Sequence, residues 1–332
     1  MPNKLVAAKL IAVTVLFGAG VACSPVAAQG QSREAASWSQ GIGEDLAAGL
    51  SSPLRPVKVS DAFRKHWRDG KAEISSYDIT TVRYGKPRQG KLVLVYVAEP
   101  MDRRTWIKDD QGDVPRAFQV DMLKLNQMLS FRTGIYPYSV MTSVFSPVEG
   151  VGRERFAPAK ISLSAQEWCG HVYHQLHPKG SHFYDEIHSY FSGEGNRRER
   201  VQTAPLALYE DALLIQLRGL DGPFAGGGDW SGDLVPALWS FRKDHVAPRP
   251  VHATITRGDA VRNGTPVTRF VLRQGSQTRT IDVEKVAPRR VLGWQSSDGE
   301  RASLVKTSRL TYWKLNNPGD ESYLREVGLS AE

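Results

Sequence analysis

The densest group of reactive side chains in this 332-residue chain lies in residues 167–174, which read Glu-Trp-Cys-Gly-His-Val-Tyr-His. Five of the eight histidines fall between residues 171 and 188. A thiol beside an imidazole can act as a thiolate nucleophile, with Cys169 attacking, His171 taking the proton and Glu167, or an acid from another strand, orienting the imidazole. If residues 165–176 form one strand, alternation places these three side chains on one face.

Two other interpretations compete with a nucleophile. In the first, Cys169 and His171 bind zinc or copper together with His174, His182 or His188, although the chain lacks the paired Cys-x-x-Cys that gives the strong form of this signal. In the second, Cys169 is a small buried hydrophobe. The second interpretation is favoured because a lone cysteine usually packs. We therefore predict no metal, no cofactor and, on balance, no enzyme.

The first 22 residues are predicted to be a secretory signal. Lys4 and Lys9 precede an apolar run from Leu10 to Ala22, which is the layout of such a signal. The run is too short for a comfortable membrane span, and no later segment reaches the roughly 18 consecutive apolar residues that a spanning helix needs. The sequence therefore predicts export to the periplasm.

Two cleavage sites are compatible with this signal. Residues 20–23, Gly-Val-Ala-Cys, resemble a bacterial lipobox, which makes Cys23 the lipidated N-terminus and anchors the protein to a membrane. Residues 26–28, Val-Ala-Ala, fit an ordinary signal peptidase, so that the signal is residues 1–28 and Cys23 is discarded. Residues 23–56 are rich in glycine, serine and alanine, as a tether is, and favour lipidation.

The charge of the chain argues against nucleic acid as a partner. The formal charge of +8 falls to +6 once the signal, with two lysines and no acid, is removed. The basic residues are scattered and form no stripe interleaved with aromatic residues. We expect a solvated, mildly cationic surface, which can also lie against anionic lipid or polysaccharide. Loss or lipidation of Cys23 leaves Cys169 alone, so no disulfide is expected within the mature chain.

Residues 57–318 are predicted to be a β-rich body. A short helix opens at Ser60, a favourable N-cap. More than ten segments of strand length follow, with turn signals at Asn263-Gly264 and Asp298-Gly299. The other expected elements are a hairpin over 72–97, strands including 120–131, 138–145, 159–176, 182–191 and 234–241, and one helix over 205–217. A loop at 219–233 divides two possible sub-sheets, and residues 319–332 form a tail.

So many strands with one or two helices predict a large curved antiparallel sheet or an open half-barrel. With a helix on the concave side, the fold is similar to the half-barrels of exported lipoprotein carriers, whose inner face receives acyl chains. Trp294, Tyr312 and Trp313 in the last strands are aromatic residues that can line a sugar or lipid surface or pack in the core.

Three segments carry a resemblance to a known group of proteins. Residues 136–139 (Tyr-Pro-Tyr-Ser), 143–147 (Ser-Val-Phe-Ser-Pro) and 166–171 (Gln-Glu-Trp-Cys-Gly-His) resemble uncharacterised exported bacterial proteins that often carry the label "septum formation inhibitor Maf". True Maf proteins are cytosolic nucleotide pyrophosphatases with an α/β fold and a Ser-x-Ser-Pro-Arg-Arg motif near the N-terminus. Here residues 287–290 read Ala-Pro-Arg-Arg, without the serines. The resemblance therefore implies an exported envelope protein and no catalytic residue.

These observations favour a binding protein. We expect an exported, lipid-anchored envelope protein whose curved sheet binds an apolar or envelope-derived ligand or partner. The alternative is a thiol-dependent or metal-dependent enzyme centred on Cys169 and His171, with Glu167 as the orienting acid.

Overall fold

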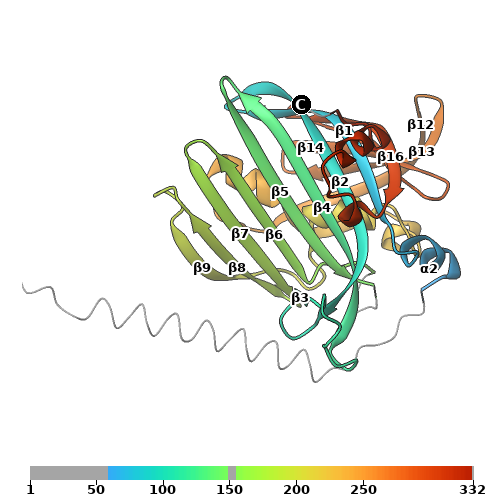
Figure 1. Ribbon diagram of the computed structural model, residues 1–332. Coiled ribbons are helices and arrows are strands. Elements are labelled where there is room, and N and C mark those ends of the chain that lie inside the picture. Colours follow the sequence, from blue (N-terminus) through green and yellow to red (C-terminus); the bar gives the residue numbers. More distant parts are fainter. Residues whose placement is uncertain (1–58, 149–154, 331–332) are drawn as a thin grey trace, which may run out of the picture. The chain divides into compact units, whose positions relative to one another are not determined.

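One sheet of sixteen strands forms most of the part that the computed structural model describes, residues 59–148 and 155–330 (Figure 1). All of these residues belong to one compact unit. The strand order is β10-β11-β12-β13-β14-β15-β16-β1-β2-β4-β5-β6-β7-β8-β9, and β3 pairs with β2. Every pairing is antiparallel except that of β10 with β11. The predicted mainly-β, curved and open sheet is confirmed.

The strands are β1 (Ala72–Arg83), β2 (Lys86–Asp102), β3 (Ile107–Lys108), β4 (Gln119–Thr133), β5 (Tyr136–Pro147), β6 (Lys160–Glu167), β7 (Gly170–Lys179), β8 (His182–Ser189), β9 (Asn196–Gln202), β10 (Leu208–Tyr209), β11 (Trp230–Val235), β12 (Val251–Arg262), β13 (Thr265–Gln274), β14 (Gln277–Glu284), β15 (Val291–Ser296) and β16 (Arg301–Leu310). The helices are α2 (Asp61–Trp67), η1 (Glu210–Ala212), α3 (Leu213–Gln216), η2 (Phe224–Gly227), α4 (Leu238–Asp244), η3 (Tyr312–Lys314) and η4 (Asp320–Val327). None of the helices in these ranges is long and apolar enough to cross a membrane.

The sheet curls until its two edge strands approach each other. These edges, β9 and β10, follow one another in the chain. The ring of Phe183 in β8 lies 6.1 Å from that of Tyr209 in β10. The backbone N–H of Ala204 donates to Asp233 Oδ2 at 2.8 Å. Side chains therefore link the edges where the backbone ladder ends.

Local signals fixed several elements correctly. The Ser60 hydroxyl accepts the N–H of Phe63 and starts α2. Asn263 and Gly264, both with positive φ, connect β12 and β13 as the turn signal predicted. The predicted hairpin over residues 72–97 is present as β1 and β2.

Three predicted elements are wrong. The helix expected over 205–217 is instead the short strand β10 followed by η1 and α3. The strand expected over 234–241 divides into the end of β11 and the helix α4. The strand expected over 159–176 is two strands, β6 and β7, joined by a turn.

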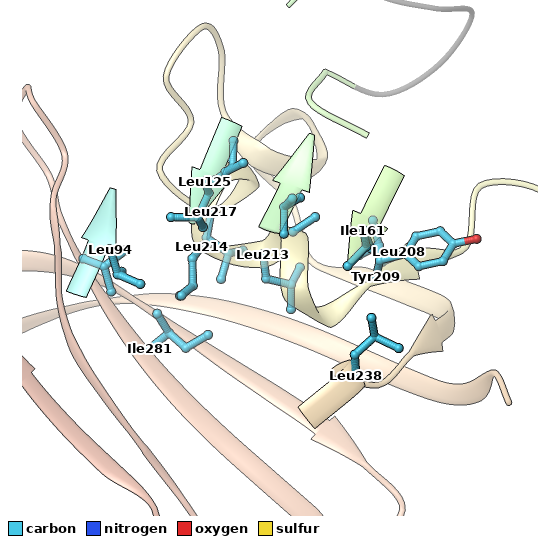
Figure 2. Packing of buried hydrophobic residues seen from close by; sticks show 14 of the residues in the cluster. Leu94, Leu125, Ile161, Leu208, Tyr209, Leu213, Leu214, Leu217, Leu238 and Ile281 are labelled. Atoms are coloured by element: carbon cyan, nitrogen blue, oxygen red, sulfur yellow. The ribbon is translucent and has the colours of Figure 1, made fainter. Parts of the chain in front are cut away.

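The concave face of the sheet is filled by residues 208–217, which we call the plug. Leu213, Leu214 and Leu217 of the plug lie among Leu94 and the other inward-pointing side chains of the main core cluster (Figure 2). Since burial of a leucine side chain contributes about 1.5 to 3 kcal/mol, this packing is a large part of what orders the segment. The hydroxyl of Tyr96 adds a hydrogen bond to the carbonyl of Leu214 at 3.1 Å.

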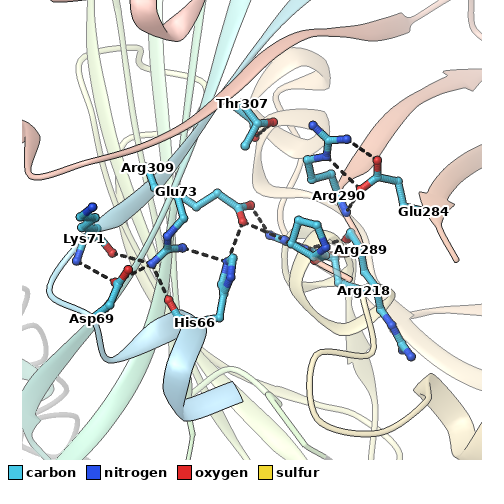
Figure 3. Close-up of polar contacts among 12 residues, drawn as sticks. His66, Asp69, Lys71, Glu73, Arg218, Glu284, Arg289, Arg290, Thr307 and Arg309 are labelled. Atoms are coloured by element: carbon cyan, nitrogen blue, oxygen red, sulfur yellow. Dashed lines mark hydrogen bonds and ion pairs between the residues drawn. The ribbon is translucent and has the colours of Figure 1, made fainter. Parts of the chain in front are cut away.

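A buried ion pair fastens the end of the plug. Arg218 Nη1 lies 2.7 Å from Glu73 Oε1 on β1 (Figure 3). Arg218 also donates to the carbonyl of Arg289 at 2.9 Å, and His66 of α2 lies 3.1 Å from the other oxygen of Glu73. The network therefore joins α2, β1, the plug and the β14–β15 loop.

Candidate functional site

The residues singled out by the sequence surround a tight turn rather than lining a strand. Glu167 ends β6 and pairs with Gly170, the first residue of β7, so that Trp168 and Cys169 form the turn between them. The Glu167 carboxylate accepts the N–H of Cys169 at 2.7 Å. His171 lies on β7 opposite Gln166 and is exposed. The expectation that alternation aligns the three side chains along one strand is wrong, because the chain reverses between the first and the third.

The turn raises the pKa of the thiol. The Glu167 carboxylate does so through its hydrogen bond with the thiol and, to a smaller extent, through its charge, so that the pKa of Cys169 lies above its ordinary value. Cys169 is exposed. A nucleophilic cysteine needs the opposite shift, because the thiolate is the reactive form. At neutral pH the thiol of Cys169 therefore stays protonated.

The other histidines of the cluster point in different directions. His174 is buried and bonds to the Asp185 carboxylate, whose second oxygen lies 2.8 Å from the Arg197 guanidinium. His182 contacts Arg200 at the far end of β8. Among residues 59–148 and 155–330, no three His, Cys, Asp or Glu side chains come together in a way that could hold a metal ion. His174 thus belongs to a structural ion network on the concave face.

A cavity of about 80 Å³, which we call the inner chamber, remains between the plug, α4 and the sheet. Its charged wall is an ion network: Glu210 Oε1 lies 2.9 Å from Arg279 Nη1, whose Nη2 lies 3.0 Å from Glu300 Oε1. The indole N–H of Trp294 also donates to Glu300 at 3.0 Å. Sites for drug-sized ligands measure roughly 300 to 1,000 Å³. The concave face is therefore filled, in contrast to the open inner face that the comparison with lipoprotein carriers predicted.

An acidic pair inside this chamber holds α4 to the plug. Asp211 accepts the N–H of Leu238 at 2.9 Å, and Glu210 accepts the N–H of Ala237 at 3.0 Å. Burial, with the nearby charge of Glu210, raises the pKa of Asp211 to about 7. Both carboxylates therefore act as hydrogen-bond acceptors at the first turn of α4.

The convex face carries a much larger cavity, about 640 Å³, beneath the C-terminal segment. We call it the outer groove. Its floor is formed by apolar side chains of the adjacent strands β16, β1, β2 and β4. Facing the floor is a wall formed by the segment that contains η3 and η4. The floor consists of Ile74, Val93, Val95, Met128 and Leu310, the wall of Tyr312, Leu315, Tyr323, Leu324 and Val327, and the polar rim of Asn126, Asn316, Asn317, Asp320 and Glu321.

Few polar contacts hold the C-terminal segment over the sheet. Lys306 Nζ donates to the carbonyl of Arg325 at 3.1 Å, and the Ser308 hydroxyl donates to the carbonyl of Glu326. Val327 packs with Ile74 and Val95 in a small cluster on the convex face. The groove is therefore bounded by a rigid sheet on one side and a lightly attached segment on the other.

One of three aromatic residues noted in the sequence belongs to this groove. Tyr312 lines it. Trp294 is buried in the main core, and Trp313 is exposed beside the groove residues in the chain without lining the groove. No local pattern in the sequence indicates the groove itself, because most of its floor lies far from its wall in the chain: Ile74 and Leu324, for example, are 250 residues apart.

Comparison with known proteins adds a structural similarity. No protein-family model matches the chain, and no curated protein matches it either. A solved structure, described as a beta-barrel-like protein of domain of unknown function DUF1849 from Brucella abortus, is similar over 72% of this chain and 98% of its own, with 10% sequence identity and a TM-score of 0.44. The geometry of the cavities is therefore what bears on function.

Proposed function

We propose that the protein binds a linear apolar ligand, the acyl chain of a lipid, in the outer groove. The observation that carries the proposal is the size of this cavity, about 640 Å³, together with its aliphatic floor. Ligand sites are mostly apolar, measure roughly 300 to 1,000 Å³ and contain a few polar groups that fix orientation. The inner chamber, at about 80 Å³, is too small to meet the condition of size.

The rim of the groove restricts the head group of the ligand. Asn126, Asn316 and Asn317 offer amide groups that can hydrogen-bond to hydroxyl or ester oxygens. Asp320 and Glu321 add two carboxylates, which repel an anionic head group at close range. A lipid with an uncharged head group, such as a monoacylglycerol, fits this rim better than a phosphatidic acid does.

Export and anchoring belong to the same proposal. They are supported by the apolar run from Leu10 to Ala22 and by the lipobox-like residues that end at Cys23, all of which lie outside the described residues. An acyl-binding protein held at a membrane surface has its ligand at high local concentration. Mass spectrometry of the mature N-terminus tests this part: a lipid-modified Cys23 supports it, and an unmodified N-terminus after residue 28 contradicts the anchor.

The binding proposal is tested by titrating the protein with 1-lauroylglycerol below its micellar concentration and following the heat of binding. Val93→Glu places a carboxylate on the groove floor and should weaken binding at least about tenfold, because a buried charge lacks a partner there. The matched control is Val261→Glu, which introduces the same charge at an exposed position of β12. Equal affinity of the two variants, or no binding by the parent protein, contradicts the proposal.

The alternative of an enzyme centred on Cys169 has less support. Glu167 and His171 are near the thiol in sequence, but the first raises its pKa and the second lies across the turn. Cys169 lines none of three cavities formed by the described residues: the inner chamber, the outer groove and a polar hollow at β14–β16.

A further inference from the structure

Large apolar side chains occupy the tips of four hairpins, β1–β2, β4–β5, β6–β7 and β8–β9. Tyr84 is 58% exposed between β1 and β2, Ile135 is 77% exposed between β4 and β5, Trp168 is 69% exposed between β6 and β7, and Tyr190 is 72% exposed between β8 and β9. Single exposed apolar residues are common on soluble proteins, whereas a contiguous group indicates an interaction surface. Whether the four tips are contiguous therefore decides their meaning.

The topology places all four tips at one end of the sheet. In an antiparallel meander the connections alternate between the two ends, so these four turns share an end while the connections between them lie at the other. The tips of β4–β5, β6–β7 and β8–β9 are seen together at the upper left of Figure 1. Neighbouring tips lie at nearly the same level along the strand direction. This follows from the register, in which Ser139 pairs with Gln166 and Val172 pairs with Ser189, each close to its turn.

Direct contacts join the tips into one surface. The hydroxyl groups of Tyr84 and Tyr138 lie 2.8 Å apart. The ring of Tyr136 lies 5.9 Å from that of Tyr138 and 6.2 Å from that of Trp168. Tyr190 covers Gly170 so closely that a Cβ there would lie 2.5 Å from its ring. We call the set Tyr84, Ile135, Tyr136, Trp168 and Tyr190 the aromatic rim.

The charges around the rim are mixed, with exposed cations on the tips themselves. Lys86 and Arg132 are exposed on the first two hairpins. Of the nearby carboxylates, Glu167 accepts the backbone N–H of the β6–β7 turn, and Glu194 is buried against Arg242 at 2.9 Å. Exposed acids at this end include Asp244, at the end of α4, and Asp298, in the β15–β16 turn, which lies 3.8 Å from Lys243. The tips therefore present aromatic and aliphatic groups beside exposed basic groups.

We propose that the aromatic rim docks the protein onto the surface of a lipid bilayer. Tryptophan and tyrosine concentrate at the head-group level of membranes, where their rings meet hydrocarbon and their polar atoms meet water. Lysine and arginine beside them interact with lipid phosphates while their aliphatic stems lie along apolar material. Large side chains on separate projecting turns, with glycines between them, can enter the interface individually, as interfacial anchors do.

The rim is independent of the outer groove. The groove floor lies on the convex face of β1, β2, β4 and β16, and none of the five rim residues lines it. Loss of acyl binding therefore leaves the docking proposal intact, and loss of docking leaves acyl binding intact.

Vesicle flotation tests the proposal with the full chain carrying Cys23→Ser, so that no lipid anchor contributes. Vesicles of phosphatidylcholine are compared with vesicles that also contain phosphatidylglycerol. The triple variant Ile135→Ser, Trp168→Ser and Tyr190→Ser should lower the partition coefficient at least about tenfold. All three positions are exposed, so circular dichroism should show an unchanged fold.

The control replaces three exposed aliphatic side chains at the opposite end of the sheet. Ile107, Val261 and Val286 are exposed there, at 62%, 65% and 70%, and their triple replacement by serine should leave flotation unchanged. Equal losses in the two triple variants, or none in either, overturn the proposal. The proposal is also overturned if the rim variant still floats with the vesicles but shows a changed molar mass in light scattering. That result would assign the rim to contact between copies of the protein.

A second readout does not depend on the strength of binding. Lipids brominated near the head group should quench part of the tryptophan fluorescence of the bound protein. The Trp168→Phe variant should still bind the vesicles but should lose the quenched part of the fluorescence. Unchanged quenching in this variant would mean that Trp168 does not enter the bilayer and would contradict the docking geometry.

Discussion

The Arg218 guanidinium lies 2.7 Å from the Glu73 carboxylate, and each side chain is only 1% exposed. Burial alone raises the pKa of Glu73, but the charge of Arg218 and the hydrogen bond from His66 outweigh it and hold the pKa at about 2. The ring of Tyr96 lies 4.6 Å from the guanidinium, and the carbonyl of Pro288 accepts one of its N–H groups. Each charge is therefore compensated inside the fold, and neither can be removed alone without cost.

Replacing Arg218 with methionine should lower the free energy of unfolding by about 3 to 5 kcal/mol, because the Glu73 carboxylate stays buried without its cation. Urea unfolding followed by tryptophan fluorescence measures the change. Adding Glu73→Gln should recover part of the loss, since the double variant buries no charge at this point. Arg273→Met, at an exposed position of β13, is the control and should change stability by less than about 0.5 kcal/mol. A loss no larger than that of the control would contradict the structural role of the pair.

The buried Asp211 should make stability fall as pH rises through the weakly acidic range. Its pKa is about 7 in the fold because of burial, whereas an unfolded aspartate titrates near 4. Between about pH 4 and pH 7 the native state therefore binds more protons than the unfolded state, and the free energy of unfolding decreases by at most about 1.4 kcal/mol per pH unit.

Asp211→Asn keeps an oxygen for the N–H of Leu238 and removes the titrating group. Urea midpoints of this variant across the same pH range should show a smaller decrease than those of the parent protein. Asp259→Asn, at an exposed position of β12, should retain the decrease. The same slope in all three proteins would show that Asp211 does not titrate in this range.

Local patterns in the sequence were sufficient for the elements that local physics controls. Alternation predicted the strands, Asn263-Gly264 predicted the turn that its positive φ angles require, and Ser60 predicted the start of α2. The turn formed by Trp168 and Cys169 contains no Asn-Gly or Asp-Gly pair. It is stabilised by the carboxylate of Glu167, the last residue of β6, which accepts the N–H of Cys169. The sequence pattern over residues 159–176 therefore predicted one long strand where the structure has β6 and β7.

Tertiary contacts decided the elements that the sequence did not predict. The leucines of residues 205–217 have helical spacing, but β10 pairs with β11 and the rest of the segment is surrounded by the sheet, so only one turn of α-helix forms. The outer groove could not be predicted from the sequence, because it forms only when η4 folds back onto β1 and β16. The inner chamber likewise joins Asp211 to Arg279, which are on different elements, and no local pattern indicates such a pair.

The Cys169 thiol should react slowly with iodoacetamide at neutral pH, although it is exposed. Its pKa is raised by the Glu167 carboxylate, so the thiolate fraction stays small until the solution is alkaline. Glu167→Gln should speed alkylation at neutral pH, as measured by mass spectrometry of the peptide that contains Cys169. Glu186→Gln, which changes a carboxylate on β8, should leave the rate as it is. Fast alkylation of the parent protein at neutral pH would contradict the raised pKa and favour a nucleophilic role.

Gly293 should tolerate no side chain, because β15 passes very close to its neighbours there. Its φ is 149°, and a Cβ would lie 2.2 Å from the carbonyl oxygen of Ala302 and 2.5 Å from the Arg262 guanidinium. Arg262 itself lies 3.2 Å from Asp282, so it cannot move away without breaking that ion pair. Gly293→Ala should therefore destabilise the fold by at least about 2 kcal/mol.

The matched control for this position is Gly258→Ala on β12, where a Cβ meets nothing within 4 Å. Because alanine restricts the unfolded chain more than glycine does, this variant should be neutral or stabilised by up to about 1 kcal/mol. Thermal unfolding of both variants, followed by circular dichroism, separates the two effects. If both substitutions shifted the midpoint equally, the close approach of β15 to β16 at Gly293 would be wrong, and with it the register that joins the second half of the sheet to β1.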